Sequence, residues 1–339
     1  MRRLAALAAL LFVLGLSACS GSADDPVSES SSTLPGATAT TEPPSTVPPS
    51  TVPPSTVPAP TGTAGCGTPA DAPTIADTRP GDVERTLTVG DRERIYRIGV
   101  PSGYDDEHPT PLVMNLHGAG SNALQASIYG GVPQEADKRG MIEIAPQAID
   151  GKWQLGGSGY DQDFLVALLN DIEARYCVDP DRVYLVGMSL GAWKAAATAC
   201  AMGDRVAALA LVTVEVRPGT CLSIPVVAFH GTADPIVPYG EGSGHEFPGS
   251  PNAGLPGTRD NIANWAKGNG CDATPDKSQI GTDVEVWTYR HCTADVVLYT
   301  IVGGGHTWPG ETIKTGATTH TIDATSIAFD WFDDHPRRD

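Results

Sequence analysis

The chain has 339 residues, of which 40% are hydrophobic, and its formal net charge is -18 at pH 7. So acidic a chain lacks the basic surface that nucleic acid and anionic lipid require, and we expect neither kind of partner. The hydrophobic residues are unevenly spread, and residues 1–65 do not have the composition of a folded core.

The amino-terminal end has the pattern of an export signal. A basic start, Met1-Arg2-Arg3, precedes an apolar stretch at residues 4–15 that is too short to span a membrane. The run Leu16-Ser17-Ala18-Cys19 resembles the lipobox of bacterial lipoproteins, in which the cysteine is lipidated after cleavage. We therefore expect a lipoprotein signal peptide at residues 1–18 and an extracellular chain anchored to the cell membrane through Cys19. The alternative is an ordinary signal peptide and a released chain.

Residues 19–65 form a linker rich in Ser, Thr and Pro, in which the unit Pro-Pro-Ser-Thr-Val recurs between Pro43 and Pro58. Proline fixes φ and removes a backbone donor, so we expect an extended spacer without a core. Its hydroxyl groups are candidates for O-glycosylation. Residues 66–339 have the size of one large domain, and no second linker interrupts them.

An even number of cysteines in the exported part predicts disulfides. Cys271 and Cys292 are the best expected pair, because a turn-rich stretch between them can close a local loop. The other pairings stay open. The spacing does not resemble zinc ligation, so we expect no metal site. The six cysteines after Cys19 are Cys66, Cys177, Cys200, Cys221, Cys271 and Cys292.

Apolar runs that are typical of buried strands alternate with helical patterns. Helices are predicted at residues 161–176, where apolar side chains repeat at helical spacing, and at the alanine-rich residues 192–202. Such alternation indicates an α/β fold, with a mostly parallel sheet and helices on both faces. The predicted strands cover residues 111–116, 141–145, 182–186, 206–212, 225–229 and 296–302.

The sharpest chemical signal is Gly187-Met188-Ser189-Leu190-Gly191, which lies between a predicted strand and a predicted helix. In this context Gly-x-Ser-x-Gly is a nucleophile elbow, where a strained turn exposes the serine and glycines permit close backbone approach. The helix N-terminus would direct N–H groups at developing negative charge. We predict that Ser189 is the nucleophile. The same five-residue pattern without a flanking strand and helix would indicate only a turn.

Asp234 is the predicted orienting acid. It follows the buried strand at residues 225–229, at the edge of the sheet where sites of α/β proteins lie. An aspartate there would hold the tautomer of a histidine and stabilise its cation. The alternative is a surface turn. Asp260, Asp272 and Asp295 are weaker candidates, because none of them ends such a strand.

The base should follow the acid, since α/β-hydrolases run nucleophile, acid, base along the chain. His306 fits, because Gly303-Gly304-Gly305 after the last predicted strand lets the loop fold back toward the serine. His320 and His335 lie in or near the C-terminal helix, and His245 precedes the last strand, so they are weaker.

An oxyanion hole needs two N–H donors, one from the residue after the nucleophile and one from an earlier strand-to-helix loop. Leu190 is the first. Ala119, in Leu116-His117-Gly118-Ala119-Gly120, is our choice for the second. We expect His117 to support this loop rather than to act as a base.

Together these motifs resemble the secreted α/β-hydrolase esterases that include polyhydroxybutyrate depolymerases and the feruloyl and acetylxylan esterases of carbohydrate esterase family 1. The resemblance covers nearly all of residues 66–339 and implies the same triad, ester hydrolysis through an acyl-enzyme, and no metal or other cofactor. It does not fix the acyl group. The motifs are Leu116-His117-Gly118, the stretch 175–184, the elbow, His230-Gly231-Thr232-Ala233-Asp234-Pro235 with the following Ile236-Val237-Pro238-Tyr239, and residues 303–310.

The chain departs from many relatives beside the nucleophile, with Leu190-Gly191-Ala192 instead of Asn-Gly-Gly, and at Trp153-Gln154 instead of Trp-Asn. Neither change touches the triad, but both leave the acyl and alcohol preference open. Trp153 and Trp308 are candidate flat walls for an aromatic or sugar ring, and both could equally be core residues.

We therefore expect a monomeric extracellular serine esterase whose substrates are feruloyl or acetyl polysaccharide esters or hydroxyalkanoate oligomers. A third possible substrate class is an ester of the cell envelope close to the anchor. The tether and the lack of a separate polymer-binding module argue against insoluble polymer. The alternative of a different class is a non-catalytic cell-surface binding protein on the same scaffold.

Overall fold

The computed structural model describes residues 62–72, 74, 84–240 and 257–337. The predicted signal peptide, Cys19, residues 20–61 of the predicted linker, and His245 lie outside the described residues. Within the described residues, no helix is long and apolar enough to cross a membrane.

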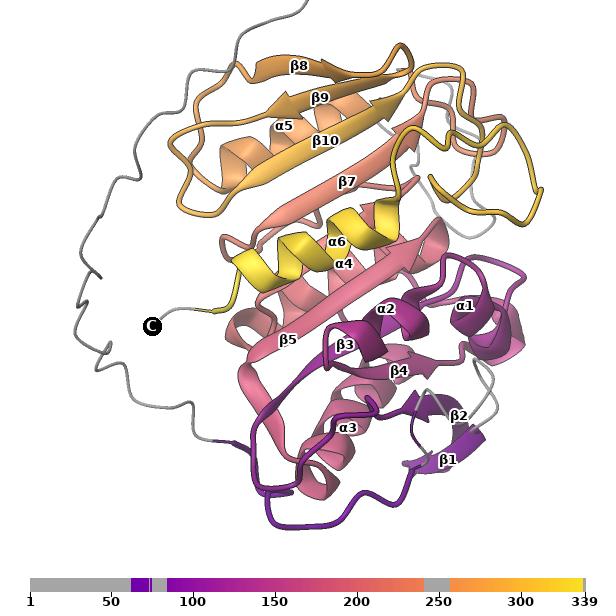
Figure 1. Cartoon of the computed structure of the whole chain (residues 1–339), viewed down its shortest axis with the longest axis vertical. Helices are drawn as coiled ribbons and strands as arrows, with labels where there is room; N and C mark the ends of the chain where they lie inside the picture. The colour runs from indigo at the N-terminus through magenta and orange to yellow at the C-terminus, as the bar shows by residue number, and fades with distance from the viewer. Residues whose placement is uncertain (1–61, 73, 75–83, 241–256, 338–339) are drawn as a thin grey trace, which may run out of the picture. The chain divides into compact units, whose positions relative to one another are not determined.

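A 10-stranded sheet forms the centre of the fold, in the order β1-β2-β4-β3-β5-β6-β7-β10-β9-β8 (Figure 1). The strands from β4 to β10 in this order are parallel, and an antiparallel pair extends the sheet at each edge. The strands are β1 (Glu84–Val89), β2 (Arg92–Gly99), β3 (Thr110–Leu116), β4 (Ile142–Pro146), β5 (Val178–Met188), β6 (Ala208–Val212), β7 (Val226–Gly231), β8 (Asp276–Ile280), β9 (Val284–Thr288) and β10 (Val296–Ile301).

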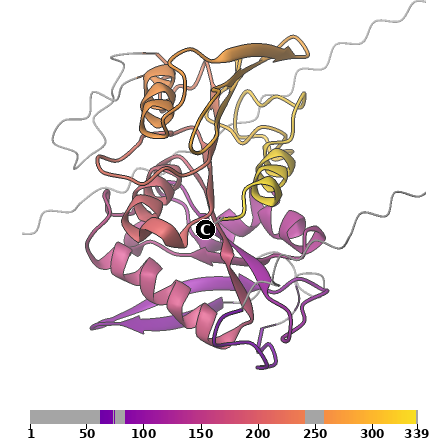
Figure 2. The ribbon, with the colours of Figure 1, turned by 90° about the vertical axis from the view of Figure 1, so that its left-hand side faces the viewer.

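Helices cover both faces of this sheet, as predicted. Helices α3, α4 and α5 share one hydrophobic cluster with the sheet, and α2 and α6 share another on the opposite face. Figure 2 shows α5 and α6 on opposite sides of the sheet. The helices are α1 (Ala123–Ile128), α2 (Val132–Lys138), α3 (Tyr160–Arg175), α4 (Leu190–Met202), α5 (Thr258–Gly268) and α6 (Ala324–Asp334).

The predicted central strands and the two predicted helices are all present, although β5 begins at Val178, ahead of the predicted start at residue 182. The prediction missed the antiparallel edge strands, the short helices α1 and α2, and helix α5. Strand β8 explains one omission, because all of its residues are exposed and it has no apolar pattern to find. The six parallel strands and their covering helices constitute the α/β-hydrolase fold.

Three disulfides join the six described cysteines. Cys271–Cys292 is confirmed, and it closes the local loop that carries β8 and β9. The pairings that the sequence left open are Cys66–Cys177 and Cys200–Cys221. The first fixes the start of the described chain to the end of α3, where the Thr63 hydroxyl also donates to the Tyr176 carbonyl at 2.9 Å.

Glu143 is a carboxyl group in the middle of the core. It lies in β4 with an exposed fraction of 2%, and its Oε1 accepts from Asn115 Nδ2 at 3.3 Å. Burial raises the pKa of Glu143 to about 8, although the hydrogen bond from Asn115 and the charge of Arg97 oppose the shift. The folded chain therefore holds a proton on Glu143 at neutral pH.

The proton on Glu143 should make the stability of the fold depend on pH. Because the unfolded chain releases the proton near pH 4.5, the free energy of unfolding should fall as the pH rises from there through about 8. Glutamine does not titrate, so Glu143→Gln should have the same melting temperature as the parent at pH 5 and a higher melting temperature than the parent at pH 9. Thermal unfolding of both proteins between pH 5 and pH 9 measures this difference. Glu93→Gln, at an exposed position, is the control. A difference in melting temperature that does not change with pH would contradict the assignment.

Candidate active site

Ser189 lies between β5 and α4 in a strained turn, with φ 58° and ψ -125°. Few residues other than glycine adopt such a positive φ. A Cβ on Gly187 would lie 2.5 Å from the Gly191 carbonyl carbon, and a Cβ on Gly191 would lie 2.1 Å from the Leu116 carbonyl oxygen. The predicted reason for both glycines, close backbone approach, is confirmed. The turn directs Ser189 into a cavity at the carboxyl ends of the strands.

The close approach predicts that Gly191→Ala disrupts the elbow. The new methyl group would meet the backbone of β3, which cannot move without displacing its neighbours, so we expect a loss of about 3 kcal/mol or more in the free energy of unfolding. Denaturant unfolding measures it. Gly103→Ala is the matched control, since a Cβ there meets no atom within 4 Å. If the two variants unfold with equal free energy, the backbone around Gly191 can accommodate a methyl group and the expected clash is absent.

Asp234 follows β7 and has a fully buried side chain. Its Oδ1 accepts from the backbone N–H groups of Ile236 and Val237, both at 2.8 Å, and its Oδ2 accepts from Nδ1 of His306 at 2.7 Å. Burial alone would raise the pKa of this carboxyl group, but His230, His306 and the Val237 amide hold it well below its usual range. Asp234 is therefore ionised, and it fixes the proton of His306 on Nδ1.

His306 stands on the loop after β10, and this loop is held against the end of β7. The Ala233 N–H donates to the Gly304 carbonyl at 2.8 Å, and a Cβ on Gly231 would lie 2.3 Å from the same oxygen. With Nδ1 bonded to Asp234, Nε2 of His306 is the nitrogen left to act as a base. His306 and Ser189 line the same cavity.

The rival acids and bases lie elsewhere. Asp272 and Asp295 each form an ion pair with a histidine other than His306, and for Asp295 this partner is the rival base His335. Asp260 lies in the first turn of α5. Of the predicted acids in the described chain, Asp234 is the one that bonds to His306.

Residues 117–120 form the predicted oxyanion loop, and His117 holds this loop in place. Its Nδ1 donates to the Gly118 carbonyl at 2.8 Å, and its Nε2 accepts from the Ala148 N–H at 3.0 Å. Burial lowers the pKa of this imidazole. Both ring nitrogens are engaged within the protein, as expected of a residue that supports the loop. Ala119 lines the cavity beside Ser189. Leu190 is the first residue of α4, so its N–H has no partner within the helix.

The cavity around Ser189 has a volume of about 570 Å³ and a mostly apolar wall. Ile128, Ile236 and Ile313 line it and are about half exposed, so they form its mouth. Trp308 is a wall residue, and its Nε1 donates to Thr325 Oγ1 at 2.8 Å. Polar groups reach the cavity from Ser121, Gln125, Tyr129 and Thr315.

Trp153 is not among the residues that line this cavity. It is buried, its Nε1 donates to the His117 carbonyl at 2.9 Å, and its ring packs on the imidazole of His117 with centroids 5.0 Å apart. Trp153 thus packs against the loop of residues 117–120 as a core residue, and it does not form a wall of the cavity.

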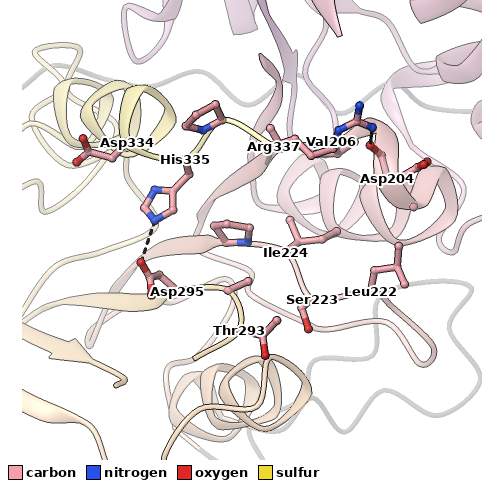
Figure 3. A pocket seen from close by; sticks show the side chains of 15 residues that line it. Asp204, Val206, Leu222, Ser223, Ile224, Thr293, Asp295, Asp334, His335 and Arg337 are labelled. Atoms are coloured by element: carbon pink, nitrogen blue, oxygen red, sulfur yellow. Dashed lines mark hydrogen bonds and ion pairs between the residues drawn. The ribbon is translucent and has the colours of Figure 1, made fainter. Parts of the chain in front are cut away.

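A second cavity, of about 670 Å³, lies at the amino ends of β6, β7 and β10, opposite the candidate site. Figure 3 shows His335 bonded to Asp295 on its wall, with Asp204 and Arg337 across from them. None of the predicted catalytic residues lines it. In the described part of the chain, no group of three or more His, Cys, Asp or Glu side chains is placed to hold a metal ion.

No family model matches the chain. It is 30% identical over 226 residues to feruloyl esterase B of Piromyces equi, an alignment that covers 62% of this chain and 42% of that protein. It is 28% identical over 299 residues to the protein named "Putative esterase NocK" of Nocardia uniformis subsp. tsuyamanensis, covering 78% of this chain and 86% of that protein.

Among solved structures, an acetyl xylan esterase from Aspergillus awamori superposes with a TM-score of 0.53 at 14% identity, covering 74% of this chain and 98% of that one. A likeness at this identity concerns the fold alone. The expected resemblance to polyhydroxybutyrate depolymerases stays a prediction. The chain is thus similar in sequence to proteins named as a feruloyl esterase and a putative esterase, and it has the α/β-hydrolase fold, as its motifs predicted.

Proposed function

We propose that the chain is a carboxylic ester hydrolase in which Ser189, Asp234 and His306 form the catalytic triad. One observation carries the proposal: a serine in a strained elbow shares a cavity with a histidine whose Nδ1 donates to a buried, ionised aspartate. This is the arrangement that activates a serine hydroxyl. The relatives named as esterases support it.

In the proposed reaction, Nε2 of His306 takes the proton of Ser189 Oγ as this oxygen attacks the ester carbonyl. The N–H groups of Ala119 and Leu190 hold the resulting oxyanion. His306 then gives its proton to the departing alkoxide, which leaves as the alcohol and an acyl-enzyme remains. Water attacks the acyl-enzyme with His306 as base, and Ser189 takes the proton back as the acid leaves. Asp234 stays ionised throughout.

The wall of the cavity favours an acyl group larger than acetyl. An acetyl group would leave most of about 570 Å³ empty, whereas an aromatic acyl group could contact the isoleucines at the mouth. We therefore propose feruloyl esters of soluble polysaccharide fragments as the first substrate class. Acetyl esters, hydroxyalkanoate oligomers and envelope esters are the further candidates.

The three disulfides fit a protein that folds and works outside the reducing cytoplasm. Anchoring is a separate proposal, because it rests on the sequence around Cys19 alone. A lipid on Cys19 would place residues 20–61 as a spacer between the membrane and the catalytic domain, which would then lie within reach of soluble esters near the cell surface.

Ser189→Ala tests the nucleophile. The variant should lose at least about a thousandfold in kcat/KM toward p-nitrophenyl acetate, longer acyl esters, methyl ferulate and hydroxybutyrate oligomers, because no other group can form the acyl-enzyme. Its thermal unfolding should match that of the parent within a few degrees, since the cavity accepts a hydrogen in place of the hydroxyl. Hydrolysis retained by the variant would rule out Ser189.

Ile313→Asn tests the acyl class. Loss of apolar contact at the mouth should lower kcat/KM for methyl ferulate about tenfold and change that for p-nitrophenyl acetate less than about threefold, because acetyl does not reach the residue. Ile280→Asn, an exposed isoleucine of β8, is the control. A parallel loss for both esters would argue against an aromatic acyl group in this cavity.

A further inference from the structure

Two buried charged residues behind the candidate triad have no part in the mechanism above. His230 lies in β7, ahead of Asp234, and its exposed fraction is 2%. Glu215 lies after β6, and its exposed fraction is 1%. Their side chains meet, with Nδ1 of His230 at 3.0 and 3.1 Å from the two carboxylate oxygens of Glu215. Burying two such groups is costly unless they are paired and hydrogen-bonded, as they are here.

The hydrogen bonds settle the charge of His230. Its Nε2 lies 2.8 Å from the Val237 carbonyl oxygen, which can only accept. Its Nδ1 faces the Glu215 carboxylate, which also accepts, and the Thr258 hydroxyl at 2.9 Å. An acceptor therefore faces each ring nitrogen, which is the arrangement that suits an imidazolium ion with a proton on both nitrogens. Burial lowers the pKa of His230, but Glu215, Asp234 and the Val237 carbonyl outweigh burial and raise it to about 10.

This cation lies directly behind the candidate triad. Nε2 of His230 is 3.5 Å from Oδ2 of Asp234, the same oxygen that accepts from His306. Val237 donates its N–H to Asp234 Oδ1 and accepts from His230 at its carbonyl. His230 thus both balances the charge of Asp234 and closes the turn that aims the carboxylate at His306.

We propose that His230 is a permanently charged positioning residue for the Asp234–His306 pair, with Glu215 as its counter-ion. The inference rests on the proposed function of that pair. With His306 neutral, Asp234, His230 and Glu215 together carry one net negative charge. When His306 takes the serine proton, the buried cluster becomes neutral. The cation keeps Asp234 ionised, and its positive charge opposes a second positive charge on the neighbouring His306.

The other groups around His230 in the described ranges add no second charge to this cluster. Tyr239 packs edge-on against the imidazole with centroids 5.6 Å apart, and its hydroxyl bonds to Thr300 of β10. From α5, Thr258 supplies its hydroxyl, while Arg259 lies over Tyr239 and pairs with Glu285 on β9. Among the residues that the structure describes, the titratable groups that face His230 and Asp234 are therefore Glu215, His306 and Tyr239.

The protonation state can be measured directly on the full chain. Histidine-selective ¹⁵N labelling and ring-nitrogen chemical shifts should show both nitrogens of His230 protonated at pH 8. A neutral His230 ring at pH 8 would overturn the proposal. This readout needs no ester hydrolysis, so its failure is distinct from failure of the proposed function.

His230→Gln tests the effect on the pair. The glutamine N–H₂ can still donate to the Val237 carbonyl, but the charge is lost. We expect the acid limb of the plot of kcat/KM against pH to move to higher pH by about one unit. At pH 6 kcat/KM should fall about tenfold, through kcat and not through KM. At higher pH part of the lost activity should return. His335→Gln, a second carboxylate-paired histidine at the opposite end of the strands, should leave the profile in place.

An acid limb that does not move in His230→Gln, whatever the rate, would overturn the proposal, and so would an equal shift in His335→Gln. If His230→Gln does not fold, the double variant with Glu215→Gln should still show an upward shift, smaller than that for loss of the cation alone, because the loss of the Glu215 anion partly offsets it. The ring-nitrogen measurement on the unaltered chain decides the charge of His230 in either case.

Discussion

The candidate site depends on one buried carboxylate, that of Asp234. A carboxylate without solvent contact needs donors on both oxygens, and the donors here come from more than one part of the fold. The turn after β7 supplies two backbone N–H groups, the loop after β10 supplies His306, and His230 contributes a cation from within β7. The hydrogen bonds and the ion pair to this one carboxylate therefore fix the relative positions of two strand ends and one long loop.

The parallel sheet makes this convergence possible. Because β5, β7 and β10 run in the same direction, their carboxyl ends deliver the elbow serine, the aspartate and the histidine to one edge. The elbow fits there only because Gly187 and Gly191 let α4 approach β3 and β5 at backbone distance. The predicted oxyanion loop is held from the core by Trp153, which packs on the His117 ring and donates to the His117 carbonyl.

The sequence predicted the parts of this arrangement that follow from local pattern. The buried central strands are nearly continuous apolar runs, and Ser189, Asp234 and His306 each follow such a run, so chain order indicated their roles. Edge strands such as β8 escaped, because an exposed strand has no apolar period. Glu215 also escaped, since its partner His230 is fifteen positions away and only the fold brings them together. Trp153 was ambiguous, because a tryptophan can form a core or a wall equally well.

The central claim is that Ser189 is an activated nucleophile. Labelling the full chain with a fluorophosphonate at pH 7.5, followed by proteolysis and mass spectrometry, tests it directly, because the reagent needs an activated serine and ignores a mere binding pocket. The account predicts one adduct per chain, located on the peptide that contains Ser189 and blocked by prior incubation with methyl ferulate. No adduct on a folded, disulfide-bonded chain, or an adduct on another serine, would contradict the account and favour a binding protein on this scaffold.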